Sequence, residues 1–174
     1  ENWLAATPGL KVVSPSDAQS AYSLLRAAIQ DPDPVFVLEP RVLYAERGEV
    51  DTSLIATIGK ARIDRVGSAL TIVSLGQMVK VSREAIAASG VDAELIDLAT
   101  VVPWDRKTVW DSVRKTGRLI VVEESPQSGG WGSEIVASVT GELFSSLKSA
   151  PFRITAPDVP VPFNGNLEAR FIPT

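Results

Sequence analysis

Carboxylates and a glycine-rich loop are the features of this chain most able to support chemistry, because its 174 residues include no histidine and no cysteine. That composition excludes His-containing nucleophilic triads, His-ligated zinc or iron sites, Cys-ligated metals and disulfides within this chain. Three groups of residues remain as candidates: the loop around Gly130, the acidic pair Glu123 and Glu124, and the aspartates Asp31 and Asp33.

The glycine-rich segment 128–133, SGGWGS, follows an apolar run and precedes a predicted helix, a position where anions are often bound. It lacks the Lys-Ser/Thr of a Walker loop and the full spacing of a dinucleotide fingerprint. We therefore favour a structural interpretation, in which the glycines let the helix begin close to the sheet edge and Trp131 packs over neighbouring loops. The alternatives are a stand-alone flavodoxin-like nucleotide-binding module that uses Gly129–Gly132, and a purely structural interaction domain.

Glu123 and Glu124 end the most apolar predicted strand at its C-terminal edge, where ligands gather in open α/β sheets. Paired carboxylates can do acid-base work if their environments drive their pKa values apart. Adjacent strand residues point to opposite faces, however, so the two cannot easily share one substrate. We expect solvated acids at the end of the strand.

Asp31 and Asp33 follow a predicted helix, where exposed carbonyls and nearby carboxylates can enclose a hard cation through oxygen ligands. Asp and Pro residues also simply terminate helices. From these residues alone, both interpretations are equally supported.

The elements that position these residues form two series. The segment SPSD at 14–17 indicates a helix start, with a capping Ser14, a proline at the first helical position and an acid three residues after the cap. Ala18, Tyr22, Leu25 and Ile29 follow at helical spacing and predict a buried stripe. A short apolar strand end at 11–13 precedes this helix, segment 31–34 stops it, and 35–38 is a predicted strand, which completes a βαβ fragment.

Weak periodicity over 40–67 indicates a linker between domains, with an edge strand around 61–64. Beyond it, the pattern predicts strands at 69–75, 94–98, 119–122 and 152–155. It also predicts helices at 77–88, after a capping Asp105, and at about 132–147. This alternation predicts an α/β fold, with an open, largely parallel sheet and helices on both faces.

The bulk composition narrows the class of protein. With 45% hydrophobic and 22% charged residues, the chain has the composition of a globular domain. The net charge of −4 argues against nucleic acid as a partner. No apolar run approaches the roughly 20 residues needed to span a bilayer, and no signal-peptide pattern is visible at the first residues.

Two segments resemble one known family. The run ELIDLATVVPWDRKTVWDSVRKTGRLIVVEESPQSGGWGSEI, from Glu94 to Ile135, resembles the C-terminal domain of the β subunit of a thiamine-diphosphate-dependent 2-oxoacid dehydrogenase, the E1 component. The opening ENWLAATPGLKVVSPSDA resembles the end of that subunit's pyrimidine-binding domain. The resemblance implies an incomplete pyrimidine-binding domain at 1–45, a linker at 46–67 and a transketolase-like C-terminal domain at 68–174.

The resemblance also implies a parent function. E1 decarboxylates a 2-oxoacid on thiamine diphosphate and acylates the lipoyl groups of the E2 acyltransferase, as an oxidoreductase of a multienzyme complex. The family's activating Glu and the His of its HSQ motif would lie before Glu1, and its usual final helix after a YxP motif is absent. We therefore expect no catalytic or cofactor-binding residue in this segment, which would be inactive alone and would supply subunit interface and E2 docking.

The implied cofactors and partners follow the same family. Thiamine diphosphate and Mg²⁺ would have their main ligands elsewhere, and the partners would be an E1 α subunit and a second β subunit in an α2β2 heterotetramer, together with E2. The run AAIQDPDP resembles a structural potassium site, whose ligands would be the backbone oxygens of Ala28 and Ile29 with Asp31 and Asp33. Asp158 and Glu168 are candidates for an acidic E2-docking surface. The family works in the bacterial cytoplasm or the mitochondrial matrix.

Overall fold

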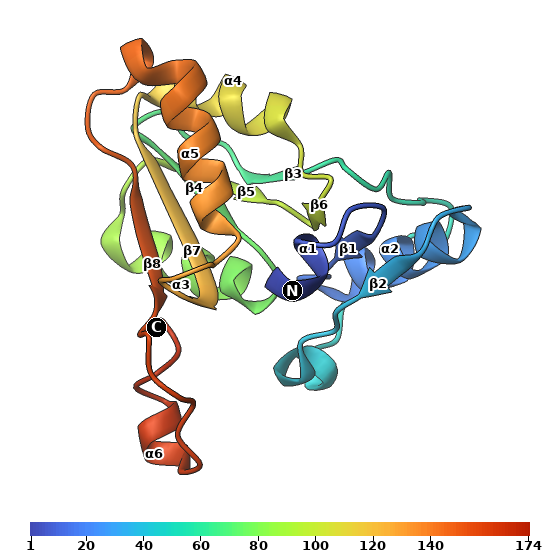
Figure 1. Ribbon diagram of the computed structural model, residues 1–174. Helices are drawn as coiled ribbons and strands as arrows, with labels where there is room; N and C mark the ends of the chain where they lie inside the picture. The colour runs from blue at the N-terminus through green and yellow to red at the C-terminus, as the bar shows by residue number, and fades with distance from the viewer.

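The computed structural model describes all 174 residues and contains two β-sheets flanked by helices (Figure 1). The larger sheet has the strand order β3-β5-β4-β7-β8. Its central pairs are parallel, and only β3 runs antiparallel to its neighbour β5. This confirms the predicted open, largely parallel sheet. The strands are β3 (Arg62–Arg65), β4 (Leu70–Ser74), β5 (Ala93–Asp97), β7 (Leu119–Pro126) and β8 (Phe152–Ala156).

Helices cover both faces of this sheet, as the sequence predicts. Alternate residues of β4 show the two faces: Val73 packs in the main core beneath α4 and α5, whereas Ile72 packs in a second core beneath α3. These helices are α3 (Gln77–Ser89), α4 (Arg106–Thr116) and α5 (Gly132–Leu143). Figure 1 shows α4 and α5 together on one side of the strands.

Local signals explain where these helices begin and end. The Asp105 carboxylate accepts a hydrogen bond from the Thr108 N–H and so caps α4. Gly90 and Gly117 end α3 and α4 with φ of 67° and 73°, a left-handed conformation that glycine adopts without strain. The helix expected at 132–147 is shorter, because α5 gives way to a 3-10 turn, η2 (Phe144–Ser146).

The chain before the predicted linker at 46–67, which we call its first part, forms the predicted βαβ fragment; the second part runs from β3 to the last residue. The strands of the βαβ fragment are parallel and belong to a separate sheet with the order β2-β1-β6. The third strand was not predicted: β6 comes from the second part of the chain and pairs antiparallel with β1, so both parts share one sheet. The remaining elements are α1 (Asn2–Ala5), β1 (Lys11–Val13), α2 (Ala18–Gln30), β2 (Val35–Val37), η1 (Arg41–Ala45), β6 (Thr100–Val102) and α6 (Gly165–Glu168). No helix has the length and apolarity that crossing a membrane requires.

The start of α2 corrects the expected cap. Asp17, not Ser14, is the N-cap, and it forms a reciprocal capping box with Ser20. The Ser14 hydroxyl instead donates to the Leu38 carbonyl, which ties β1 to the end of β2.

The buried face of α2 also differs from the expected stripe. The buried residues are Ser20, Ser23 and Leu24, whereas Leu25 is 44% exposed and Ile29 is 75% exposed. Helical spacing identifies an apolar face but not whether anything covers it. The serines can be buried because their hydroxyls bond to the helix backbone, as Ser23 does with the Gln19 carbonyl.

Two neighbouring leucines test this assignment. Leu24→Ala should lower the free energy of unfolding by about 2–5 kcal/mol, because it removes a fully buried side chain and leaves a cavity. Leu25→Ala, the matched control, should lower it by less than about 1 kcal/mol. Urea unfolding of both variants measures the difference, and equal losses would contradict the observed orientation of α2.

Candidate functional site

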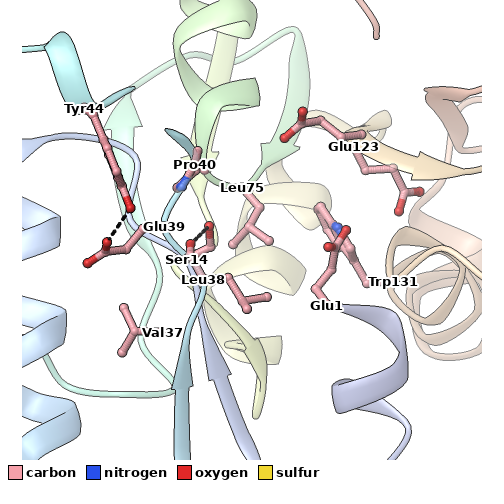
Figure 2. Close-up of a pocket in the computed structure, with 12 residues that line it drawn as sticks. Glu1, Ser14, Val37, Leu38, Glu39, Pro40, Tyr44, Leu75, Glu123 and Trp131 are labelled. Atoms are coloured by element: carbon pink, nitrogen blue, oxygen red, sulfur yellow. Dashed lines mark hydrogen bonds between the residues drawn. The ribbon is translucent and has the colours of Figure 1, made fainter. Parts of the chain in front are cut away.

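A cleft of about 410 Å³ lies where the C-terminal ends of β4 and β7 face the segment after β2 (Figure 2). Gly76 follows β4, Glu124 lies near the end of β7, and Glu39 and Tyr44 come from the segment after β2. β4 and β7 are neighbours in the sheet, but the chain leads from β4 to β5 on one side and from β7 to β8 on the other. In open α/β sheets, ligands usually bind in the crevice between two neighbouring strands whose connections leave in opposite directions.

The cleft is acidic. Glu1, Glu39, Glu123 and Glu124 line it, and no lysine or arginine does. Burial raises the pKa of Glu124, although the Gln77 amide donates a hydrogen bond to it. Figure 2 shows the Tyr44 hydroxyl directed at Glu39, and this 2.9 Å hydrogen bond raises the pKa of Tyr44. These groups do not fit a diphosphate, which needs cations or free N–H donors.

Glu123 corrects the expectation of solvated acids, because it is only 1% exposed. Its carboxylate accepts hydrogen bonds from Arg153 Nε at 2.8 Å and from the Gly132 N–H at 3.1 Å. Burial raises its pKa, and the two donors oppose that shift. Glu124 bonds to α3 whereas Glu123 bonds at the start of α5, so the two carboxylates point to opposite faces as expected, yet both border the same cleft.

The glycine-rich loop has the structural role that the sequence favours. Gly132 lies against Glu123, and a Cβ added to it would also come within 2.8 Å of Val121 Cγ1. A Cβ on Gly130 would lie 2.5 Å from Arg153 Nη2. Trp131 between them is 7% exposed and packs in the main core. The protein's own carboxylate therefore occupies the start of α5, where a phosphate-binding loop would hold its ligand.

Sequence reasoning missed the partnership of Glu123 with Arg153. The two residues lie thirty positions apart, and only the register of β7 against β8 brings them together. The only sign of a buried ion pair in the sequence was an acid at the end of an apolar strand, and we expected that acid to be solvated.

Two of the predicted potassium ligands, Asp31 and Asp33, form ion pairs with Lys11. Lys11 Nζ lies 2.7 Å from Asp31 and 3.0 Å from Asp33, and the hydrogen bond from Lys11 lowers the pKa of Asp31. Ala28 and Ile29 lie in the last turn of α2, and no backbone N–H beyond the helix bonds to their carbonyls. No group of three or more His, Cys, Asp or Glu side chains is arranged to hold a metal. The ion at these four residues stays a prediction.

The close approach of Gly132 generates a prediction. Gly132→Ala should lower the free energy of unfolding by about 1–3 kcal/mol, because the new methyl group must displace Glu123 or Val121. Gly141→Ala in the same helix meets nothing within 4 Å and should be neutral or stabilise by up to about 1 kcal/mol. Thermal unfolding compares the two, and a Gly132 variant as stable as the Gly141 variant would refute the structural role.

Comparisons with known proteins follow the same two parts of the chain. A family model described as the transketolase C-terminal domain matches residues 59–174, and the transketolase pyrimidine binding domain matches residues 1–47. The solved structure of a split-gene transketolase, described as an inactive β4 tetramer, superimposes with a TM-score of 0.76. That match has 23% identity and covers 98% of this chain and 55% of the other, so it shows the fold alone.

Curated relatives are more similar in sequence. The mitochondrial pyruvate dehydrogenase E1 component subunit beta-1 of Arabidopsis thaliana is 45% identical over 98% of this chain and 49% of its own length. The pyruvate dehydrogenase E1 β subunit of Rhizobium meliloti is 43% identical over 98% of this chain and 38% of its own. The mitochondrial 2-oxoisovalerate dehydrogenase β subunit of Dictyostelium discoideum is 39% identical over 93% and 45%.

The chain spans about half the length of the curated relatives it matches. Two thirds of its residues lie within one family match, and that match covers the whole five-stranded sheet. By its residues 59–174, this chain belongs to the transketolase C-terminal domain family.

Proposed function

We propose that this chain serves as the C-terminal part of the β subunit of a 2-oxoacid dehydrogenase E1. The observation that carries the proposal is 39–45% identity to E1 β subunits of pyruvate and 2-oxoisovalerate dehydrogenases along nearly the entire chain. The complete enzyme would decarboxylate a 2-oxoacid and acylate lipoyl groups on E2, and bound thiamine diphosphate would supply the electron sink.

This part of the subunit provides structure and contacts rather than the reacting groups. The acidic cleft offers a diphosphate no cation, which supports the view that other residues of the assembly hold thiamine diphosphate and Mg²⁺. The buried carboxylate beside the cleft, Glu123, is already partnered within the chain by Arg153. We divide the chain into a pyrimidine-binding part at 1–45, a linker at 46–67 and a C-terminal domain at 68–174. The side of the cleft that faces β4 and β7 then belongs to the pyrimidine-binding part.

Exposed apolar side chains on the first part of the chain support a subunit interface. Trp3 is 92% exposed, and Leu25, Ile29 and Phe36 lie exposed on α2 and β2. Apolar surface of this kind marks contact with other protein. We assign the contacts to the E1 α subunit and a second β subunit in an α2β2 heterotetramer, located in the mitochondrial matrix or the bacterial cytoplasm.

We assign the E2-docking surface to the tail around α6, which carries Asp158 and Glu168. Asp158 is committed to the glycine-rich loop, because it accepts hydrogen bonds from the Ser128 N–H at 2.9 Å and hydroxyl at 2.7 Å. Glu168 is exposed and belongs to a segment that extends away from the sheet (Figure 1). A basic E2 domain would meet this charge, with binding that weakens as salt increases.

A chimeric enzyme tests the proposed function. We would replace the aligned half of the Rhizobium meliloti β subunit with this chain and co-express it with the E1 α subunit of the same enzyme. The chimera should form a heterotetramer and oxidise pyruvate with ferricyanide as electron acceptor, whereas the 174-residue chain alone should neither bind thiamine diphosphate in calorimetry nor oxidise pyruvate. Turnover by the chain alone would refute the division of roles, and failure of a correctly assembled chimera to oxidise any 2-oxoacid would refute the function.

The potassium site has its own test. When the K⁺ concentration is ten times the dissociation constant of the site, KCl should stabilise the folded chain by about 1.4 kcal/mol relative to choline chloride of equal ionic strength. The reason is that K⁺ would bind the end of α2 only in the folded state. Asp31→Asn should abolish the difference in thermal unfolding, while Asp51→Asn, on an exposed turn away from α2's end, should keep it. Equal stability in both salts would show that Lys11 alone satisfies these carboxylates.

A further inference from the structure

A cluster of charged residues joins the two parts of the chain where the start of α2 meets β3 and β5. Arg62 Nη2 lies 2.6 Å from Asp17, the N-cap of α2, and 3.1 Å from Asp97 at the end of β5. Asp97 also accepts a hydrogen bond of 2.5 Å from the Ser16 hydroxyl. We call Ser16, Asp17, Arg62 and Asp97 the Asp97 junction, in which both Arg62 and Asp97 contact the start of α2 from the second part of the chain.

The charges around the junction do not balance. Arg62 is shared by Asp17, Asp97 and, at 3.6 Å, Asp64. Arg83 of α3 pairs with Asp64 at 2.7 Å. Two guanidinium groups therefore face three carboxylates, and one negative charge lacks a partner of its own. Lys60, which lines the neighbouring pocket, does not supply it, because its ammonium lies 3.8 Å from Asp105.

Asp97 is the carboxylate least able to keep that charge, because it is 1% exposed whereas Arg62 and Asp17 reach solvent. Burial raises the pKa of Asp97 from 3.8 to about 6, against the opposing effects of Ser16 and Arg62. A hydroxyl can donate to a carboxylate or accept from a neutral acid, so Ser16 can keep its hydrogen bond in either state.

We propose that Asp97 is a proton-sensitive latch between the two parts of the chain, and that its neutral form holds the start of α2 against β3 and β5 more firmly than its carboxylate does. The inference does not depend on the proposed function, because every group involved belongs to this chain. The contact it controls borders the β1–β6 pairing, since the Ala99 N–H also donates to Asp97 and the Ala99 carbonyl accepts from the Ser14 N–H.

The direction of the pH effect follows from linkage. When the parts separate, Asp97 becomes hydrated and its pKa returns toward 3.8, so the docked state binds the proton more tightly. Docking is therefore strongest at low pH within the window between about 4 and 6, and it weakens as Asp97 ionises. Asp17 acts oppositely: hydrogen bonds from Ser20 and Arg62 outweigh burial and lower its pKa, so its contribution is lost only below about pH 4.

Hydrogen exchange on the full chain measures the latch. After correction for intrinsic exchange rates, the opening equilibrium reported by the Ser14 N–H should increase roughly tenfold from pH 5 to pH 7. In Asp97→Asn, which keeps the shape but cannot ionise, it should stay constant. The Gly117 N–H, which donates to the Val113 carbonyl in α4, serves as an internal control. The same pH dependence in both proteins, or an opening that decreases with pH, would overturn the proposal.

A direct NMR titration of Asp97 tests the proposal even if the Asp97→Asn variant does not fold. The ¹³C chemical shift of the Asp97 carboxyl should titrate with a midpoint near 6. Ser16→Ala should move that midpoint upward, because it removes a donor that favours the carboxylate. A midpoint below 4.5 in the unmodified chain would refute the latch.

Discussion

The pairing of β1 with β6 is the constraint on which the rest of the structure depends. It joins a strand from the first part of the chain to one from the second. The βαβ fragment is therefore hydrogen-bonded to the rest of the protein through a shared sheet. The acidic cleft exists because this pairing brings the segment after β2 opposite the ends of β4 and β7. The Asp97 junction exists because the same pairing brings Asp17 beside Arg62.

Buried carboxylates serve as connectors in this protein. Glu123 anchors the glycine-rich loop through Arg153 and Gly132, and Glu94 of β5 pairs with Lys115 of α4. Asp97 differs from both, because its arginine is shared with other acids. A buried carboxylate stays ionised only where donors replace water, so the number of dedicated partners decides which acid is sensitive to pH.

The arrangement is consistent with the proposed supporting role of this chain. The acids at the carboxyl edge of the sheet bond within the chain, as Glu123 does, or line a cleft that no lysine or arginine lines. At the same time, α2 and β2 present apolar side chains outward, among them Ile29 and Phe36. Both features suit the proposed role, in which other subunits would cover the apolar surface.

The sequence by itself determined the alternation of strands and helices, because periodicity and caps such as Asp105 and Gly117 act within a few residues. It also indicated that the loop at 128–133 was structural. Tertiary structure alone decided the pairing of β6, the burial of Glu123 and the covered face of α2. Each of these depends on residues thirty or more positions away, or on whether another surface lies opposite, and local patterns carry no information about either.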